Sequence, residues 1–158
     1  MTAQEREVTL RFLAEPTDVN FGGKVHGGMV MKWIDQAAYT CAVGWSGCYC
    51  VTVYVGGIRF YQPVLIGHLV EVHAKIIYTG TTSMHLAVDV SSRDPQKGTA
   101  AKTTHCIIIF VALNQKGQPI AVPRWEPKTP EDQALEQYAV KLMQLRKGIE
   151  EEMGSFTS

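Results

Sequence analysis

The sequence from residue 27 to residue 44 is GGMVMKWIDQAAYTCAVG, and this stretch decides the fold. Between Met29 and Ala42 its apolar side chains would occupy almost every side of a helix. A helix that is apolar on most sides is a buried one. We therefore expect one long buried helix at the centre of the fold.

Strand-forming segments lie on both sides of this helix. Residues 8–13 predict a short strand, and residues 15–26, with one proline and two glycines, predict a loop. After the helix, β-branched residues gather in four stretches, at residues 50–55, 69–78, 83–90 and 103–113. The links between them are short and carry turn residues, which favours antiparallel hairpins. We expect these four strands to form a meander.

The C-terminal segment has a different character. Three prolines between residues 123 and 130 mark a linker, and Thr129 is a good N-cap for a helix that begins at Pro130. One face of this amphipathic helix would carry Leu135, Tyr138, Leu142, Leu145 and Ile149. We expect residues 1–125 to form one domain and residues 126–158 to form a helical extension that packs on the sheet or on a neighbouring subunit.

Composition excludes several classes of protein. The 158 residues suit one domain, and 15 basic residues balance 15 acidic ones, so no global field attracts nucleic acid or anionic lipid. No apolar run reaches the roughly 18 residues of a membrane span, and the polar N-terminus is no signal peptide. The four cysteines form no C-x-x-C pair and no zinc-ligand spacing. We expect a cytoplasmic protein with unpaired thiols, no metal, no nucleic acid and no membrane contact.

One helix and one sheet pose a packing problem. A single curved sheet covers only one face of a helix, whereas this helix is apolar nearly all round. A second subunit must cover the rest, so we expect an obligate homo-oligomer.

Asp35 is the outlier within the apolar helix. Burying a carboxylate costs several kcal/mol unless it is paired, so its presence needs a reason. One reason is chemistry. The other is an i,i+3 ion pair with Lys32 on a partly exposed rim.

Two further features precede Asp35. Gly27 and Gly28 would let a ligand approach backbone N–H groups at the positive end of the helix, although a tight loop-to-helix turn explains the pair equally well. Asn20 offers an amide that can hold a carbonyl or orient a water, and an Asx-turn is the alternative.

These residues form a pattern that resembles a known family, the cytosolic acyl-CoA thioester hydrolases of the hotdog fold. The first block is Asp18-x-Asn20-x-x-Gly23-x-x-x-Gly27-Gly28-x-x-Met31-x-x-x-Asp35-x-x-Ala38. Later blocks match at comparable spacing: Val51-Thr52-Val53, Phe60-x-x-Pro63-Val64, Gly80-Thr81-Thr82-Ser83, Lys102-Thr103 and Asn114-Gln115-x-Gly117-x-Pro119. The resemblance covers roughly residues 6 to 125.

The resemblance implies an α+β hotdog fold, in which a curved antiparallel sheet of five to six strands wraps one long helix. It implies hydrolysis of acyl-CoA to free CoA and a carboxylic acid, with no cofactor, since coenzyme A is part of substrate and product. It also implies a dimer of hotdogs and then a trimer of dimers, that is, a hexamer.

The resemblance also assigns roles to residues. Asp35 would be the catalytic carboxylate, Asn20 its partner, and Gly27 or Gly28 the source of an oxyanion-hole N–H. The CoA cleft would be lined by Gly80, Thr81, Thr82, Ser83, Lys102 and Thr103. His26 and Thr52 lie beside these positions. We expect Lys102 to lie near the turn at residues 80–83, where a cation and backbone donors could meet phosphates.

The chemistry suits so small a set of residues. A thiol with a pKa near 8.5 is a good leaving group, so one carboxylate and a few oxyanion donors can suffice. The chain has no G-x-S-x-G nucleophile elbow. Whether Asp35 is a general base or a nucleophile stays open. The alternatives are a 3-hydroxyacyl thioester dehydratase of the same fold, for which His26 is available, and a CoA- or lipid-binding module without turnover.

Gly28 and Asp35 are seven residues apart, about 10 Å along a helix axis. An oxyanion donor and a base acting on one carbon must each lie within roughly 3–4 Å of their reacting atoms. We therefore expect each active site to combine residues of two subunits, with Asn20 on the oxyanion side.

Overall fold

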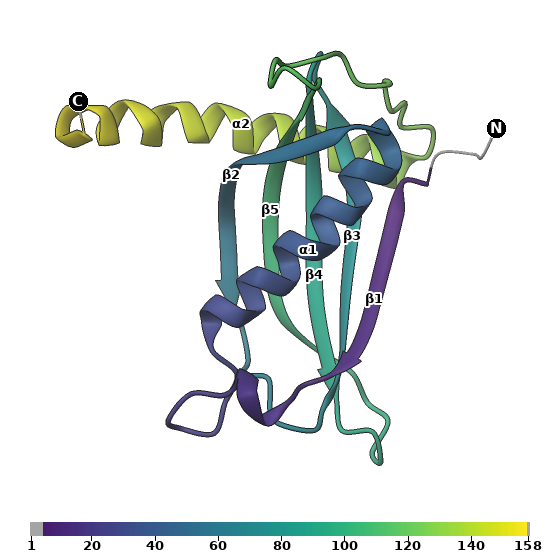
Figure 1. The fold of residues 1–158 in the computed structure, drawn as a ribbon, viewed down its shortest axis with the longest axis vertical. Coiled ribbons are helices and arrows are strands. Elements are labelled where there is room, and N and C mark those ends of the chain that lie inside the picture. Colours follow the sequence, from purple (N-terminus) through teal and green to yellow (C-terminus); the bar gives the residue numbers. More distant parts are fainter. Residues whose placement is uncertain (1–4, 158) are drawn as a thin grey trace.

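The computed structural model describes residues 5–157 (Figure 1). Its elements follow in the order β1 (Glu7–Leu13), a 3₁₀ turn (Pro16–Asp18), α1 (Gly27–Ser46), β2 (Tyr49–Phe60), β3 (Leu69–Thr79), β4 (Ser83–Arg93), β5 (Ala101–Leu113) and α2 (Pro130–Thr157). Helix α1 lies across one face of the sheet, and α2 crosses the opposite face near one end of the strands (Figure 1). Within the described residues, no helix is both long and apolar enough to cross a membrane.

The sheet has five strands in the order β1-β3-β4-β5-β2, and every pairing is antiparallel. This confirms the predicted hotdog architecture of one helix wrapped by a curved antiparallel sheet. The predicted four-strand meander is wrong in one respect: β2 pairs with β5 and not with β3. The segment between β2 and β3 forms no hairpin, because its backbone makes hydrogen bonds with residues that precede α1. The N–H of Val25 donates to the carbonyl of Val64, and the N–H of Gly67 donates to that of Ala14. These bonds carry the chain to the β1 side of the sheet.

Helix α1 buries one face against the sheet. Its buried residues are Val30, Trp33, Ile34, Ala37, Ala38, Cys41, Ala42 and Trp45. They meet the inward side chains of β3, β4 and β5, which include Val72, Leu86 and Ile108. The helix ends at Gly47, whose φ of 71° is the left-handed conformation that favours glycine. The opposite side of α1 stays open in a single chain, where Met31 is 42% exposed.

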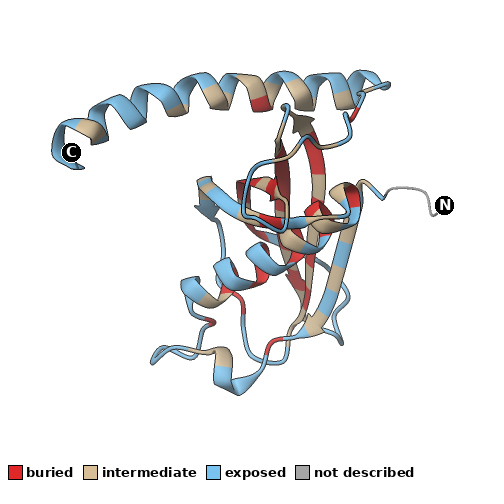
Figure 2. Cartoon of the chain, turned by 45° about the horizontal axis from the view of Figure 1, so that its top comes forward, coloured by how far each residue is buried: buried red, intermediate tan, exposed pale blue. Residues whose placement is uncertain are grey.

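Helix α2 covers the outer face of the sheet with its first half. Thr129 caps it as predicted, since its Oγ1 accepts a hydrogen bond from the N–H of Asp132 at 3.0 Å. A second apolar cluster of Ile77, Ala87, Ile107 and Ala139 forms under the helix. Beyond it, α2 extends past the edge of the sheet (Figure 2). Leu145 and Ile149 are therefore 65% and 53% exposed, although they continue the predicted apolar face.

Strand β2 is an irregular edge strand. Its register against β5 shifts between Thr52 and Tyr54 and again between Gly56 and Arg59. Gly57 lies between the second pair with a φ of 60°. Each shift changes which side chains point inward. The alternation of apolar and polar residues therefore predicted a strand only as far as residue 55. Just before the first shift, Thr52 pairs with Phe110, and its side chain lies on the α1 side, where it reaches Asp35.

Candidate functional site

A carboxylate and a hydroxyl meet between α1 and the edge strand β2. The Oγ1 of Thr52 donates a hydrogen bond of 2.7 Å to the Oδ1 of Asp35. Both residues are exposed in a single chain, so the expected burial of Asp35 is wrong for one subunit alone. The alternative ion pair with Lys32 does not form, since within residues 5–157 no basic group lies within 4.0 Å of the Asp35 carboxylate. Thr52 leaves the second carboxylate oxygen free.

Asp35 opens into a cavity of about 280 Å³. Its walls are mostly apolar, with Lys32 as the one basic residue among those that line it. Around the carboxylate lie Met31, Ile34, Val55, Ile58 and Ile108. Cys106 also lines this cavity, but burial raises the pKa of its thiol to about 11. A thiol with that pKa carries almost no thiolate near neutral pH, so Cys106 is not an activated nucleophile.

The start of α1 presents unused hydrogen-bond donors. His26 is the N-cap and makes no capping bond with its exposed side chain, while the N–H groups of Met29 and Val30 donate back to its carbonyl. The N–H groups of Gly27 and Gly28 have no partner within residues 5–157. A Cβ on Gly28 would meet nothing within 4 Å. Packing within the chain therefore does not explain why residue 28 is a glycine. The two N–H groups without partners lie at the positive end of a helix.

Asn20 adopts the Asx-turn that was the alternative interpretation. Its Oδ1 accepts hydrogen bonds from the N–H of Gly22 at 2.9 Å and of Lys24 at 3.2 Å. These bonds use the amide oxygen and leave the NH₂ group available to a ligand. The turn fixes the side chain at the mouth of a cavity of about 310 Å³ that Gly27 also lines.

The single chain thus divides the predicted catalytic residues between two cavities. Asn20 and Gly27 line one, and Asp35 lines the other. Gly28 lines the Asp35 cavity, but it precedes Asp35 by seven residues, about 10 Å along the helix axis.

The residues predicted to line the CoA cleft do not lie together within one chain. Ser83 pairs with Val111 at one end of β4, and Ser91 pairs with Lys102 towards the other. Lys102 is therefore separated from the turn at residues 80–83 by about 26 Å, at roughly 3.3 Å per residue. Within one chain the expected proximity does not hold, because in an antiparallel hairpin the start of one strand faces the end of the other.

The turn itself packs against the chain that follows β5. The N–H groups of Ala112 and Val122 donate to the carbonyls of Thr82 and Thr81. Gly80 donates to the carbonyl of Ser83, and a Cβ on Gly80 would press against the hydroxyl of Ser83. Thr103 is buried, and its hydroxyl donates to the carbonyl of Val90 at 3.1 Å. Any ligand contacts of these residues remain predictions.

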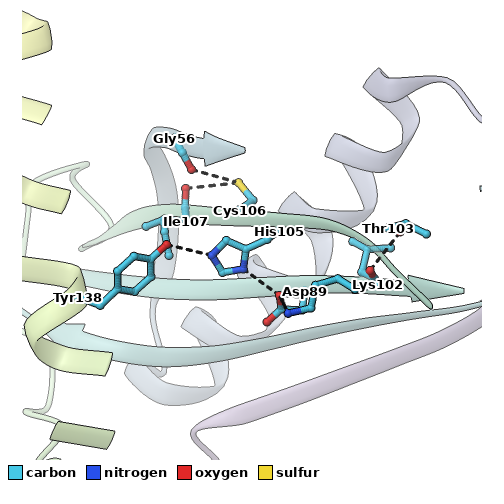
Figure 3. A network of polar contacts seen from close by, with 9 residues as sticks. Gly56, Asp89, Lys102, Thr103, His105, Cys106, Ile107 and Tyr138 are labelled. Atoms are coloured by element: carbon cyan, nitrogen blue, oxygen red, sulfur yellow. Dashed lines mark hydrogen bonds and ion pairs between the residues drawn. The ribbon is translucent and has the colours of Figure 1, made fainter. Parts of the chain in front are cut away.

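A polar network on the outer face of the sheet was not foreseen (Figure 3). The Nδ1 of His105 lies 2.8 Å from the Oδ1 of Asp89, and its Nε2 lies 3.1 Å from the hydroxyl of Tyr138 on α2. The Nζ of Lys102 lies 3.1 Å from the same Asp89 oxygen. Burial opposes ionisation of Asp89, but the bonds from His105 and Lys102 outweigh it and lower the pKa of this carboxyl. Only the strand register, which places Asp89 opposite His105, could have revealed this group.

No group of three or more potential metal ligands gathers anywhere in residues 5–157.

Comparison with known proteins places this geometry in context. The family model described as "Thioesterase superfamily" matches residues 22–99. The acyl-CoA thioester hydrolase YciA of Escherichia coli K12 is 32% identical over 120 residues, covering 74% of this chain and 91% of YciA. The crystal structure of an apo-hexameric acyl-CoA thioesterase has a TM-score of 0.86 at 30% identity, covering 90% of this chain and 91% of that one. An acyl-CoA hydrolase from Staphylococcus aureus, solved with butyryl-CoA and CoA, has a TM-score of 0.86 at 25% identity, covering 95% and 92%.

Proposed function

Because this chain belongs to the hotdog-fold acyl-CoA thioester hydrolases, we propose that it hydrolyses acyl-CoA thioesters to free CoA and a carboxylic acid. The observation that supports this most directly is the Asp35 carboxylate, held by Thr52 at the wall of an apolar cavity. The reaction needs no cofactor or metal, since the thioester already carries a good thiol leaving group.

Asp35 acts on water or on the acyl carbon itself. As a general base it takes a proton from water while the water oxygen attacks the thioester carbonyl carbon. As a nucleophile its free oxygen forms an anhydride, which water then opens. In both routes the C–S bond breaks, the sulfur leaves as thiolate and takes a proton, and the acyl group leaves as a carboxylic acid. Thr52 supports both, because its hydrogen bond fixes the orientation of the carboxylate.

The start of α1 stabilises the oxyanion. The unused N–H groups of Gly27 and Gly28 point from the positive end of a helix, and Asn20 adds an NH₂ donor beside Gly27. Such donors stabilise the negative charge that develops on the thioester oxygen in the transition state. The open space over Gly28 lets that oxygen approach the backbone.

Each active site combines two chains. The exposed side of α1, which carries Met31 and Asp35, needs a cover, and β2 is a free sheet edge beside it. The hexameric state of a structural neighbour supports a homo-oligomer. With two antiparallel α1 helices face to face, the Gly27 end of one lies beside Asp35 of the other. A trimer of such dimers would make the hexamer.

Release of free thiol tests the proposed reaction. We expect a thiol-trapping dye to report turnover across a panel from acetyl-CoA to palmitoyl-CoA. A dehydratase would release no thiol from 3-hydroxyacyl-CoA. A binding module would show a thermal shift with CoA and no thiol release, and either result would refute the proposal.

A further inference from the structure

A further cavity lies on the other side of the sheet, between α2 and the outer face, with a volume of about 170 Å³. Tyr54, Ile107 and Ile109 line it. Their neighbours Val55 and Ile108 line the cavity of Asp35 instead. Because successive side chains of a strand point to opposite faces, the sheet itself separates the two cavities.

An imidazole without a hydrogen-bond partner lines this outer cavity. His85 is 3% exposed, and the one ring contact it makes within residues 5–157 is edge-on to Tyr78 at 4.9 Å. No atom within residues 5–157 donates to its ring nitrogens or accepts from them. Burial, together with the nearby Arg146 guanidinium, lowers the pKa of His85 to about 4, so the ring is neutral at pH 7. A neutral ring keeps one N–H, which a ligand in the cavity could accept.

A cation accompanies the imidazole. The guanidinium of Arg146 lies over the ring of Tyr54, 4.9 Å from its centroid, and lines the same cavity. Its Nε is buried and makes no hydrogen bond of good geometry, although Glu150 Oε1 lies 3.2 Å away. Glu150 is the carboxylate that pairs with this cation within the described residues, and its side chain is 58% exposed. The cavity therefore offers a fixed positive charge and a neutral N–H donor within apolar walls.

We propose that this outer cavity binds the ionised form of a medium-chain aliphatic carboxylic acid, with its carboxylate between Arg146 and His85 and its chain against α2. The two polar groups match a carboxylate in charge and in donor capacity. The remaining walls, which include Ile107, Ala139 and Leu142, match an alkyl chain.

The size of the cavity sets the length of the chain. An apolar cavity of about 150 Å³ holds a benzene molecule, so the outer cavity encloses roughly six to seven heavy atoms. A longer chain would continue over Leu145 and Ile149, which line the same cavity and are 65% and 53% exposed. Octanoate, with ten heavy atoms, fits this description.

The outer site goes beyond the proposed function, although the two are related chemically. A carboxylic acid of this class is what hydrolysis of a medium-chain acyl-CoA would release. The outer site is separate from Asp35 and requires no turnover to be filled, so a failure of octanoate to bind would leave the thioesterase proposal untouched.

Calorimetric titration of the 158-residue chain with octanoate tests the proposal. We expect Arg146→Gln to weaken octanoate binding by about tenfold or more, the usual effect of losing a hydrogen bond to a charged group. Glu150→Gln should tighten it, because it removes the competing carboxylate. Ala139→Leu, which fills the cavity, should abolish it. The matched control Arg124→Gln, at an exposed arginine outside the cavity, should leave it unchanged. Octanol should bind wild type more weakly and should not respond to Arg146→Gln.

Two results would overturn the proposal. The first is equal octanoate affinity in all four variants, when melting curves show that each variant is folded. Octanoate would then bind outside the outer cavity, for instance against Asp35. Absence of octanoate binding to the wild type, with a smaller oligomer for Arg146→Gln, would mean that the cavity is covered by a second copy of the chain.

Discussion

Replacing Thr52 with valine isolates the hydrogen bond that holds the proposed catalytic carboxylate. Valine keeps the shape and the β-propensity of threonine and removes only the hydroxyl, which donates to Asp35 at 2.7 Å. A hydrogen bond to a charged group contributes about 1.5–3 kcal/mol, and the exposure of both residues favours the lower end. A loss of about 1.4 kcal/mol from the transition state is a tenfold loss of rate. We therefore expect kcat of Thr52→Val to fall about tenfold.

The assay is thiol release at saturating acyl-CoA, with Thr52→Ser as the matched control. Serine keeps the hydroxyl, so Thr52→Ser should retain most of the activity. Both variants should melt close to wild type, because residue 52 is exposed on an edge strand. Wild-type kcat in Thr52→Val, or equal losses in the valine and serine variants, would refute the idea that this hydrogen bond orients Asp35.

Three further predictions concern charged residues. Asp35→Asn should lower kcat by about 10²–10⁴-fold while the protein stays folded in a melting curve, because an amide cannot accept the proton of water. Lys102→Ala should raise KM for acyl-CoA more than for a pantetheine thioester without the nucleotide if Lys102 meets phosphate, and an equal effect on both would place Lys102 outside the CoA site. Asp89→Asn should lower the melting temperature at pH 7, where the ionised carboxylate contacts His105 and Lys102. Because folding lowers the pKa of Asp89, its ionised carboxylate stabilises the fold at pH values above about 3.8, the ordinary pKa of this group. That stabilisation is lost as the pH falls through the lower pKa of the folded state, so the melting temperatures of wild type and variant should converge in acid.

The sequence predicted those parts of the fold that local patterns determine. The apolar stretch from Gly27 predicted α1, and Thr129 before Pro130 predicted the start of α2. The partner of β2 was not predictable in this way, because short links suggest hairpins whichever strands they join. What separates β2 from β3 is bonding between residues distant in sequence, such as Val25 with Val64.

The candidate site was predictable in residue type and less so in geometry. Asp35, Asn20 and the glycines at the start of α1 stand out from their surroundings in the sequence. Thr52 stood out only by its place in a family pattern, since its contact with Asp35 depends on the register of β2. The register of β4 and β5 likewise decides that Asp89 lies opposite His105, which the sequence could not show. The same register separates Lys102 from the turn at residues 80–83 within one chain, contrary to the expectation.

Recovery of activity in mixed oligomers tests the two-chain active site most directly. Asn20→Ala and Asp35→Ala proteins should each be nearly inactive alone. Unfolded together and refolded as a mixture, half of the dimers should be mixed, and each mixed dimer should hold one intact site, which gives about a quarter of wild-type activity. Refolding either variant alone provides the control, and mass spectrometry of the intact oligomers verifies the mixing. If verified mixed oligomers remain as inactive as their parents, Asn20 and Asp35 act within one chain and the shared site is wrong.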